Sequence, residues 1–323
     1  METIIGKEEL LDRAGEIIRD GGLVAFPTET VYGLGADAFN EEAVKNIFVA
    51  KGRPEDNPLI VHIADAGDVE KVAVDVPDIA YELFDAFSPG PLTIVLKKHP
   101  DLPLTTTGGL QTVGVRIPMH EMARELIRRS NCPIAAPSAN SSGRISPTEA
   151  SFVYDDMNGK IPMILDGGSS DVGIESTVLT LCTETPTVLR PGAVTIEMLS
   201  EYLEKVVDHK GKVVVAEAPG MKYKHYAPVC PCVSACSPES ARKEYDDHDN
   251  AVIIGRDSFI SRCGNRNVVS LGETPEECMS AVFGVLRRAE KQYSYIIVES
   301  FSGVKGYFAI DNRLKKSTGG III

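Results

Sequence analysis

Four short segments of the chain combine hydroxyl, amide and cationic side chains in a way that suits the binding of an anion. The first covers residues 27–35, Pro-Thr-Glu-Thr-Val-Tyr-Gly-Leu-Gly, and directly follows an apolar run. It brings two hydroxyls, a carboxylate and a phenol into one tight stretch. A connection from a strand to a helix, in which threonine hydroxyls satisfy backbone groups, would have the same composition. On its own, this segment favours neither interpretation.

The second segment carries two cations, Lys51 and Arg53, on either side of Gly52. Because they lie at the predicted end of a helix, they could simply complement the negative end of its dipole. The prolines at positions 54 and 58 stiffen the chain that follows, however, and this suits a fixed anion site. Arginine offers a planar fork of donors and lysine a point charge, a useful pair for a polyphosphate.

The third segment begins where a predicted strand ends in two alanines, at 135–136, and continues through Ser138 and Asn140. Small residues at a strand end let a ligand approach the backbone closely. In open α/β sheets, ligands commonly bind beyond the carboxyl ends of the strands. We therefore expect the side chains of Ser138 and Asn140 to donate hydrogen bonds to a ligand.

The fourth segment pairs the Glu-Ser-Thr sequence at 175–177 with Arg190, which a proline follows at a predicted strand end. Viewed singly, Arg190 fits a surface arginine better than a phosphate ligand. Thr112 and Arg116 lie on another predicted strand, where their even spacing puts both on one face. The candidates for a single positively charged pocket are thus Lys51, Arg53, Arg116 and Arg190.

Apolar runs and helical spacing alternate along the first two thirds of the chain and predict the elements that must position these segments. A helix is expected to end at the paired glycines 21–22, and a second one to cover 41–50 behind the cap Asn40. Strands are predicted at 23–26, 59–63, 92–96, 113–117, 134–136, 163–165, 177–181 and 187–189, and helices at 119–129 and 195–205. This alternation predicts an α/β fold with a mixed, twisted sheet.

The chain changes character between residues 207 and 250, where Pro-Gly and acidic stretches replace long periodicity. We expect a linker there, with a short strand at 212–215, and long segments of this kind are often functional. Beyond it, strands are predicted at 251–255, 267–271 and 295–298, and helices after Thr274 and at 308–316, which make a second, small α/β unit. The predicted domains are therefore 1–206, a linker at 207–250, and 251–323.

Composition places the chain among globular proteins and restricts its partners. Its 323 residues exceed what one core usually supports. The net charge of −13 argues against general nucleic-acid binding, which depends on cations, although a local basic site for a nucleotide is compatible with it. No signal peptide is visible, and no apolar run approaches the roughly 20 residues of a membrane span. Seven cysteines, an odd number, indicate reduced thiols and a cytoplasmic location.

Two further features have an ordinary explanation. Cys230, Cys232 and Cys236 could hold zinc or form a redox pair, but the spacing lacks paired CxxC motifs, so incidental thiols are favoured. His62 lies on an apolar strand, where a histidine is more often a core residue than a ligand. The sequence contains no Ser-His-Asp set and no P-loop. This fits a reaction that needs orientation and charge stabilisation rather than a covalent nucleophile.

Taken together, these residues resemble the two-domain threonylcarbamoyl-AMP synthases, whose catalytic part is a YrdC-like domain. The matching motifs are Pro27–Gly35, Lys51-x-Arg53 with Ser138-x-Asn140, Pro89–Thr93, Leu189–Gly192 and the linker motif Pro219–Pro228. The resemblance covers nearly the whole chain, more loosely in the C-terminal part. It implies a YrdC-like twisted mixed sheet with helices, joined by a long linker to a small Rossmann-like α/β domain.

The resemblance also implies a reaction. Threonine, bicarbonate and ATP give threonylcarbamoyl-AMP and pyrophosphate, with Mg²⁺ carried by ATP rather than held by a protein metal site. The product would pass to a tRNA threonylcarbamoyl transferase complex that modifies adenosine 37 of tRNAs reading ANN codons. Neither stable tRNA binding nor a membrane is expected.

Each substrate is assigned a set of residues by the same resemblance. The ATP ligands it implies are Lys51, Arg53, Asn57, Thr112, Ser138, Asn140, Ser146 and Arg190, with His225 or Tyr226 of the linker closing over the nucleotide. The threonine ligands it implies are Thr30, His62, Arg116, Ala136 and Ser176, with Thr28 a weaker candidate. Lys51 and Arg53 are the implied catalytic residues.

Two rival functions make different demands on the sequence. An RNA-binding module could use the same positive surface, but the charge of −13 counts against it. A carbamoyl-transfer enzyme of the hydrogenase-maturation type would bring zinc-finger cysteine pairs and an acylphosphatase-like segment, and the sequence contains neither.

Overall fold

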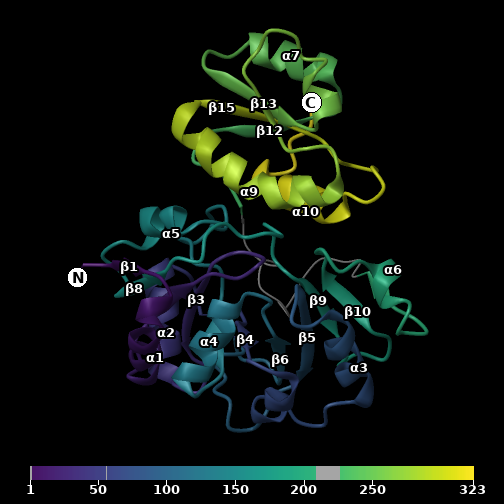
Figure 1. Ribbon diagram of the computed structural model, residues 1–323. Helices are drawn as coiled ribbons and strands as arrows, with labels where there is room; N and C mark the ends of the chain where they lie inside the picture. The colour runs from purple at the N-terminus through teal and green to yellow at the C-terminus, as the bar shows by residue number, and fades with distance from the viewer. Residues whose placement is uncertain (1, 56, 209–225) are drawn as a thin grey trace. The chain divides into compact units, whose positions relative to one another are not determined.

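The computed structural model describes residues 2–55, 57–208 and 226–323. The described residues fall into two compact units. Figure 1 shows them coloured along the chain, from purple at the N-terminus to yellow at the C-terminus. The first unit holds residues 2–142, 148–171 and 175–208. The second holds residues 226–323 together with two short segments, 143–147 and 172–174.

A mixed sheet of eleven strands forms the centre of the first unit. Its strand order is β1-β8-β2-β3-β7-β4-β6-β5-β9-β10-β11. The strands are β1 (Ile4–Gly6), β2 (Val24–Phe26), β3 (Gly33–Asp37), β4 (Ile60–His62), β5 (Leu92–Lys97), β6 (Thr112–Arg116), β7 (Ile134–Ala136), β8 (Met163–Leu165), β9 (Thr177–Thr180), β10 (Thr187–Arg190) and β11 (Val207–Asp208). The sheet contains both parallel pairs, such as β4–β6, and antiparallel pairs, such as β5–β6.

Helices cover this sheet, and one of them begins at the cap that the sequence predicts, Asn40. The helices are η1 (Glu8–Leu10), α1 (Leu11–Arg19), α2 (Glu41–Lys51), η2 (Ala66–Lys71), α3 (Asp78–Phe87), α4 (Glu121–Ser130), α5 (Ala150–Met157) and α6 (Ile196–Leu199). The helices at 78–87 and 150–157 were not predicted, and no side-chain cap marks the start of either one. At the start of α2, the side chain of Asn40 accepts a hydrogen bond from the Ala43 amide (3.1 Å). At its end, Gly52 adopts the left-handed conformation (φ 62°). The turn at Gly52 sets where Lys51 and Arg53 leave the helix.

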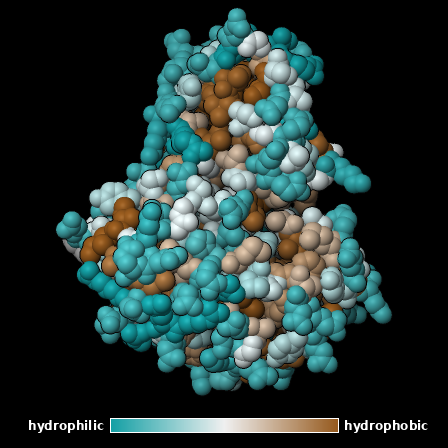
Figure 2. Space-filling view, viewed as in Figure 1, coloured by the Kyte–Doolittle hydropathy of each residue, from teal (hydrophilic) through white to brown (hydrophobic). Residues whose placement is uncertain are grey.

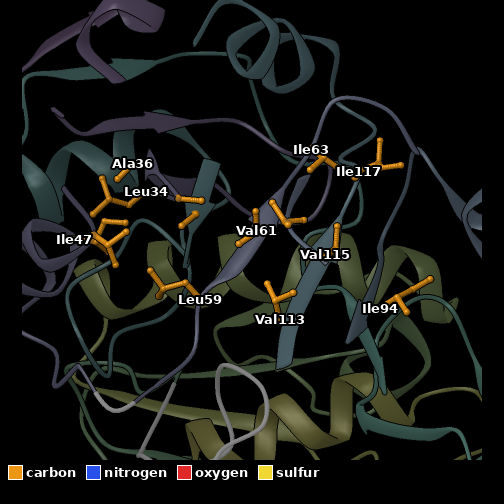
Figure 3. Packing of buried hydrophobic residues seen from close by; sticks show 14 of the residues in the cluster. Leu34, Ala36, Ile47, Leu59, Val61, Ile63, Ile94, Val113, Val115 and Ile117 are labelled. Carbon is orange, nitrogen blue, oxygen red and sulfur yellow. The ribbon is translucent and has the colours of Figure 1, made fainter. Parts of the chain in front are cut away.

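Aliphatic side chains from neighbouring strands make the core of the first unit. Figure 3 shows Val61 of β4, Val113 and Val115 of β6, and Ile94 of β5 on adjacent strands, with Ile47 of α2 in the same cluster. All of them are buried. Because the strand ends are fixed by this packing, the polar residues that follow each strand are held in register.

A parallel four-stranded sheet forms the second unit, in the order β12-β15-β13-β14. Its elements are β12 (Cys232–Ala235), α7 (Pro238–Asp246), β13 (Ala251–Gly255), α8 (Asp257–Ile260), β14 (Val268–Ser270), α9 (Pro275–Gln292), β15 (Tyr295–Glu299) and α10 (Phe308–Ser317). Helix α9 begins with a capping box, in which Thr274 and Glu277 exchange side chain-to-backbone bonds.

The α/β class and the mixed sheet are confirmed, but some elements differ from the prediction. The helix predicted at 195–205 ends at Leu199, because only Leu199 and Leu203 are buried beyond its start and no apolar stripe extends it. Strand β12 and helix α7 lie inside the segment predicted to be a linker at 207–250. The four residues of β12 are buried, and β12 pairs with the distant β15, which local periodicity does not reveal. The strand predicted at 212–215 lies outside the described residues.

The surface is polar over most of the face seen in Figure 2, with small hydrophobic areas between the hydrophilic ones. Among the helices of the described residues, none is both long and apolar enough to cross a membrane.

Candidate functional site

Residues 27–32 connect β2 to β3 and form a tightly hydrogen-bonded loop. The Thr28 hydroxyl donates to the Val31 carbonyl (2.6 Å) and accepts from the Val31 amide (3.2 Å), and it lies 2.8 Å from the Thr30 hydroxyl. Both threonines are buried. The Thr28 hydroxyl therefore satisfies backbone groups of its own loop, as expected for a connection in which threonines stabilise the backbone.

Glu29 of this loop reaches across the sheet to Arg116, at the end of β6. Nη2 of Arg116 donates to Oε1 of Glu29 (2.6 Å), and Nε donates to the Gly90 carbonyl (3.2 Å). The other oxygen of Glu29 accepts from the Met119 amide (3.0 Å). Both side chains are almost fully buried, at 5% and 3% exposed. Glu29 and the Gly90 carbonyl together fix the plane of the Arg116 guanidinium.

Ser176 links two further members of the predicted site. Its hydroxyl lies 2.8 Å from the Thr93 hydroxyl on β5 and accepts from Nη2 of Arg190 (3.1 Å). Nε of Arg190 also donates to the Ser176 carbonyl (3.0 Å). Two residues of the fourth segment, Ser176 and Arg190, are thus in direct contact.

Strand register places the polar residues of this region side by side. Arg116 pairs with Thr93 across β6–β5 and with His62 across β6–β4. His62 is buried and stacks edge-on against Phe26 at 5.9 Å between ring centroids. Its Nδ1 has no hydrogen-bond partner in the part of the chain that the structure describes. Burial, and secondarily the charge of Arg116, lower the pKa of His62 to about 3.

This histidine is expected to make stability depend on pH. Because its pKa is about 3 in the folded state and near 6.5 when unfolded, the unfolded chain binds more protons between these values. The free energy of unfolding should therefore fall by about 1.4 kcal/mol per pH unit as the pH drops below about 6.5. Urea unfolding at pH 7 and pH 5 should show wild type losing about 2 kcal/mol more than His62→Gln.

His248→Gln, made at a half-buried histidine that is paired with Glu244 in the second unit, is the matched control for the substitution itself. Equal losses in wild type and His62→Gln would show that His62 does not titrate on unfolding in this way.

Lys51 contacts two residues of the third segment, Ser138 and Asn140. Its Nζ donates to the Ser138 carbonyl and to the Asn140 carbonyl (2.6 Å). The Ser138 hydroxyl donates to the side-chain oxygen of Asn140 (2.5 Å). The Tyr32 carbonyl accepts from the Ala139 amide (2.8 Å), which joins this cluster to the 27–32 loop. Lys51, Ser138 and Asn140, which the resemblance places in one ligand set, are therefore in direct contact.

Arg53 and Asn57 follow directly and are both buried. The Arg53 guanidinium lies 5.9 Å from the centre of the Phe48 ring. Within the described residues, neither the oxygen nor the nitrogen of the Asn57 amide has a hydrogen-bond partner. A buried amide of this kind is costly unless a ligand or water satisfies it. The backbone next to Asn57 passes close to Gly108 (φ 60°), where a Cβ would lie 2.8 Å from the Pro58 nitrogen.

The strands of the first unit and the second unit place four more of the predicted residues. Thr112 begins β6 and pairs with Lys97, and Ala136 ends β7 opposite Ile60. Ser146 and Tyr226 belong to the second unit. The Tyr226 ring is buried there, stacked on Phe283 at 5.3 Å. His225 lies outside the described residues.

Sequence reasoning missed three residues that shape the site. Glu29 was seen only as a carboxylate in a motif, and its pairing with Arg116 spans 87 positions. Thr93, at the contact with Ser176, looked like part of an apolar strand. The buried Tyr32 hydroxyl donates to the Gly168 carbonyl (2.6 Å) and so anchors the loop, and burial raises the pKa of this phenol. Thr93 belongs to the matching motif Pro89–Thr93, but the sequence assigns it no role.

Two polar clusters thus share the 27–32 loop, one around Arg116 and Ser176 and the other around Lys51 and Ser138. They contain four buried cations, in a chain whose net charge is −13. Among the described residues, no group of three His, Cys, Asp or Glu side chains is placed to hold a metal ion. The arrangement can bind and orient anions, and its donors suit phosphate and carboxylate oxygens.

Comparison with known families covers almost the whole chain. Residues 16–192 match the Sua5/YciO/YrdC family model, which carries the description "Telomere recombination". Residues 194–319 match the model described as the C-terminal domain of threonylcarbamoyl-AMP synthase.

Individual relatives are similar over their full length. A threonylcarbamoyl-AMP synthase of Pyrococcus abyssi is 44% identical, with 100% of this chain and 99% of the relative covered. One of Bacillus subtilis is 42% identical, with 96% and 93% covered. The crystal structure of P. abyssi Sua5 complexed with L-threonine superimposes with a TM-score of 0.92 at 42% identity, covering 99% of both chains.

Proposed function

The chain belongs to the Sua5/YciO/YrdC family, in the form that carries the threonylcarbamoyl-AMP synthase C-terminal domain, and from this premise we propose how its residues serve the reaction. It is an L-threonylcarbamoyladenylate synthase. It converts L-threonine, bicarbonate and ATP into threonylcarbamoyl-AMP and pyrophosphate, the first step in forming N6-threonylcarbamoyladenosine in tRNA. Catalysis is assigned to the unit built mainly from residues 1–206.

The observation that supports this assignment best is the burial of four cations in an acidic chain. Lys51, Arg53, Arg116 and Arg190 are each less than a tenth exposed. The amine of threonine and bicarbonate give a carbamate and water. An oxygen of the carbamate then attacks the α-phosphorus of ATP, and the bond to pyrophosphate breaks. Both reactants are anions, so buried cations are needed to bring them together.

Threonine is proposed to bind at the cluster around Arg116. The guanidinium would hold the substrate carboxylate, in an orientation set by Glu29 and the Gly90 carbonyl. Ser176, Thr30 and the neutral His62 would contact the remaining polar groups, with the Ala136 backbone and Thr28 beside them. A histidine that stays neutral can accept a hydrogen bond from the threonine hydroxyl or amine.

ATP is proposed to bind along the second cluster. Its phosphates would be held by cations, hydroxyls and amides, from Lys51, Arg53, Asn57, Thr112, Ser138, Asn140, Ser146 and Arg190. Arg190 contacts Ser176, and so stands next to the proposed threonine ligands. His225 and Tyr226 are proposed to contact the nucleotide from the linker. Because the phosphate ligands offer no carboxylates, Mg²⁺ is proposed to enter bound to ATP.

Orientation supplies most of the remaining acceleration. Holding carbamate and ATP in line can contribute roughly 7–11 kcal/mol to lowering the barrier. The carbamate decomposes in water, so a site that excludes solvent also protects it. The adenylate product is proposed to pass to a tRNA threonylcarbamoyl transferase complex in the cytoplasm, without stable binding of tRNA to this acidic chain.

Pyrophosphate release tests this function directly. The purified protein should release pyrophosphate from Mg²⁺-ATP only when both threonine and bicarbonate are supplied, because the carbamate is the attacking group. A coupled phosphate assay with each component omitted in turn measures this requirement. Release that proceeds without threonine, or no release beside salt-dependent RNA binding, would contradict the assignment.

A further inference from the structure

Two short segments of the catalytic half of the chain pack as part of the second unit. They are residues 143–147 and 172–174, and both fall within the family match at 16–192. The first contains Ser146, a proposed ATP ligand. The second ends directly before Glu175 and Ser176, the latter a proposed threonine ligand. One helix of the second unit, α9, contacts both segments.

Buried charges on α9 hold the first segment. Nε and Nη2 of Arg287 donate to the Ile145 carbonyl (3.1 and 2.5 Å). One oxygen of Glu290 accepts from Nη2 of Arg144 (2.6 Å), and the other accepts from the Val229 amide (2.8 Å). The side chains of Arg287 and Glu290 are both 1% exposed. An arginine and a glutamate so completely buried are expensive to leave unsatisfied, so the segment is held firmly in place.

A close backbone approach holds the second segment. Gly173 has a positive φ (75°), and a Cβ built on it would lie 2.5 Å from the carbonyl oxygens of both Met279 and Ser280 in α9. Only glycine fits this position without displacing the helix backbone. This contact is independent of the charges of Arg287 and Glu290, which lie two turns or more further along the helix.

We propose that helix α9 is a positioning element for the active site, fixing the ATP-binding segment through Arg287 and Glu290 and the threonine-binding segment through Gly173. The residues act through the segments they hold and touch no reacting atom. The inference rests on the proposed substrate roles of Ser146 and Ser176. The C-terminal domain would then have a defined task in the reaction, because its helix α9 orders the two segments 143–147 and 172–174.

Kinetics of the full-length enzyme separate positioning from simple structural support. Arg287→Met removes the donors to Ile145, and Arg144→Met removes the ion pair to Glu290 while leaving the core of α9 intact. Both should raise KM for ATP about tenfold or more and leave KM for threonine within about twofold. Gly173→Ala should do the reverse, raising KM for threonine more than KM for ATP.

Arg256→Met is the matched control, since Arg256 pairs with the buried Glu299 elsewhere in the same unit. It should leave both KM values unchanged, and thermal unfolding of all variants gives their relative stability. Unchanged KM for ATP in Arg144→Met and Arg287→Met, or equal changes in both KM values that follow the loss of stability, would overturn the proposal. Wild type that releases no pyrophosphate would instead contradict the proposed function.

Discussion

Replacing Arg53 by alanine is expected to lower the turnover of pyrophosphate release by about 10²–10³-fold. Arg53 is buried, and its guanidinium lies 5.9 Å from the centre of the Phe48 ring, so burial restricts the side chain before substrate arrives. A charged donor fixed in this way stabilises the negative charge that develops on the phosphates without reorganising. Steady-state rates at saturating ATP, threonine and bicarbonate measure the loss.

Two further variants show whether the effect belongs to the site. Arg53→Lys keeps the charge but not the planar fork, and should recover only part of the rate. Arg262→Ala removes a surface arginine whose side chain is 64% exposed, and should leave the rate unchanged. If Arg53→Ala turns over within about threefold of wild type, Arg53 does not stabilise the transition state.

Loss of Arg116 is expected to damage stability and threonine binding together. Arg116→Met leaves Glu29 buried without its cation, which should lower the free energy of unfolding by about 3–5 kcal/mol. It also removes the proposed partner of the threonine carboxylate, so KM for threonine should rise by about a hundredfold or more. Urea unfolding and threonine titrations measure the two effects separately.

The double variant Glu29→Gln/Arg116→Met distinguishes the two causes. Glutamine removes the stranded charge and still offers an oxygen to the Met119 amide, so most of the stability should return. The high KM for threonine should remain, because no cation is restored. A double variant that regains normal KM together with its stability would show that Arg116 supports the fold and does not bind the substrate.

The sequence predicts the contacts around Lys51 better than the contacts around Arg116, and the reason is geometric. Lys51, Ser138 and Asn140 belong to motifs that end a helix and a strand, so local patterns indicate both their placement and their chemistry. The Glu29–Arg116 pair depends on which strands are neighbours, and β6 meets the 27–32 loop only through the order of the whole sheet. No local pattern encodes that order.

Elements were missed for related reasons. Strand β3 reads Gly-Leu-Gly-Ala-Asp, in which glycines replace the alternating apolar residues of an ordinary strand. Its glycines leave room for the Phe26 ring, which would lie 3.0 Å from a Cβ at Gly33. Strand β12 is buried on account of partners more than sixty residues away. In both strands, long-range packing decides the structure, because the β-propensity of the residues does not indicate a strand.

The pairing of β1 with β8 has a consequence for synthesis of the chain on the ribosome. Ile4 of β1 pairs with Met163 of β8, so β1 has no neighbouring strand until β8 has been synthesised. At about 5–20 residues per second, the wait lasts roughly 8–30 seconds. Throughout that time the backbone groups of β1 are unpaired, and pairing with strands of other chains competes with the native pairing to β8. Fast translation, or a chaperone that holds the nascent end, should therefore raise the yield of folded protein.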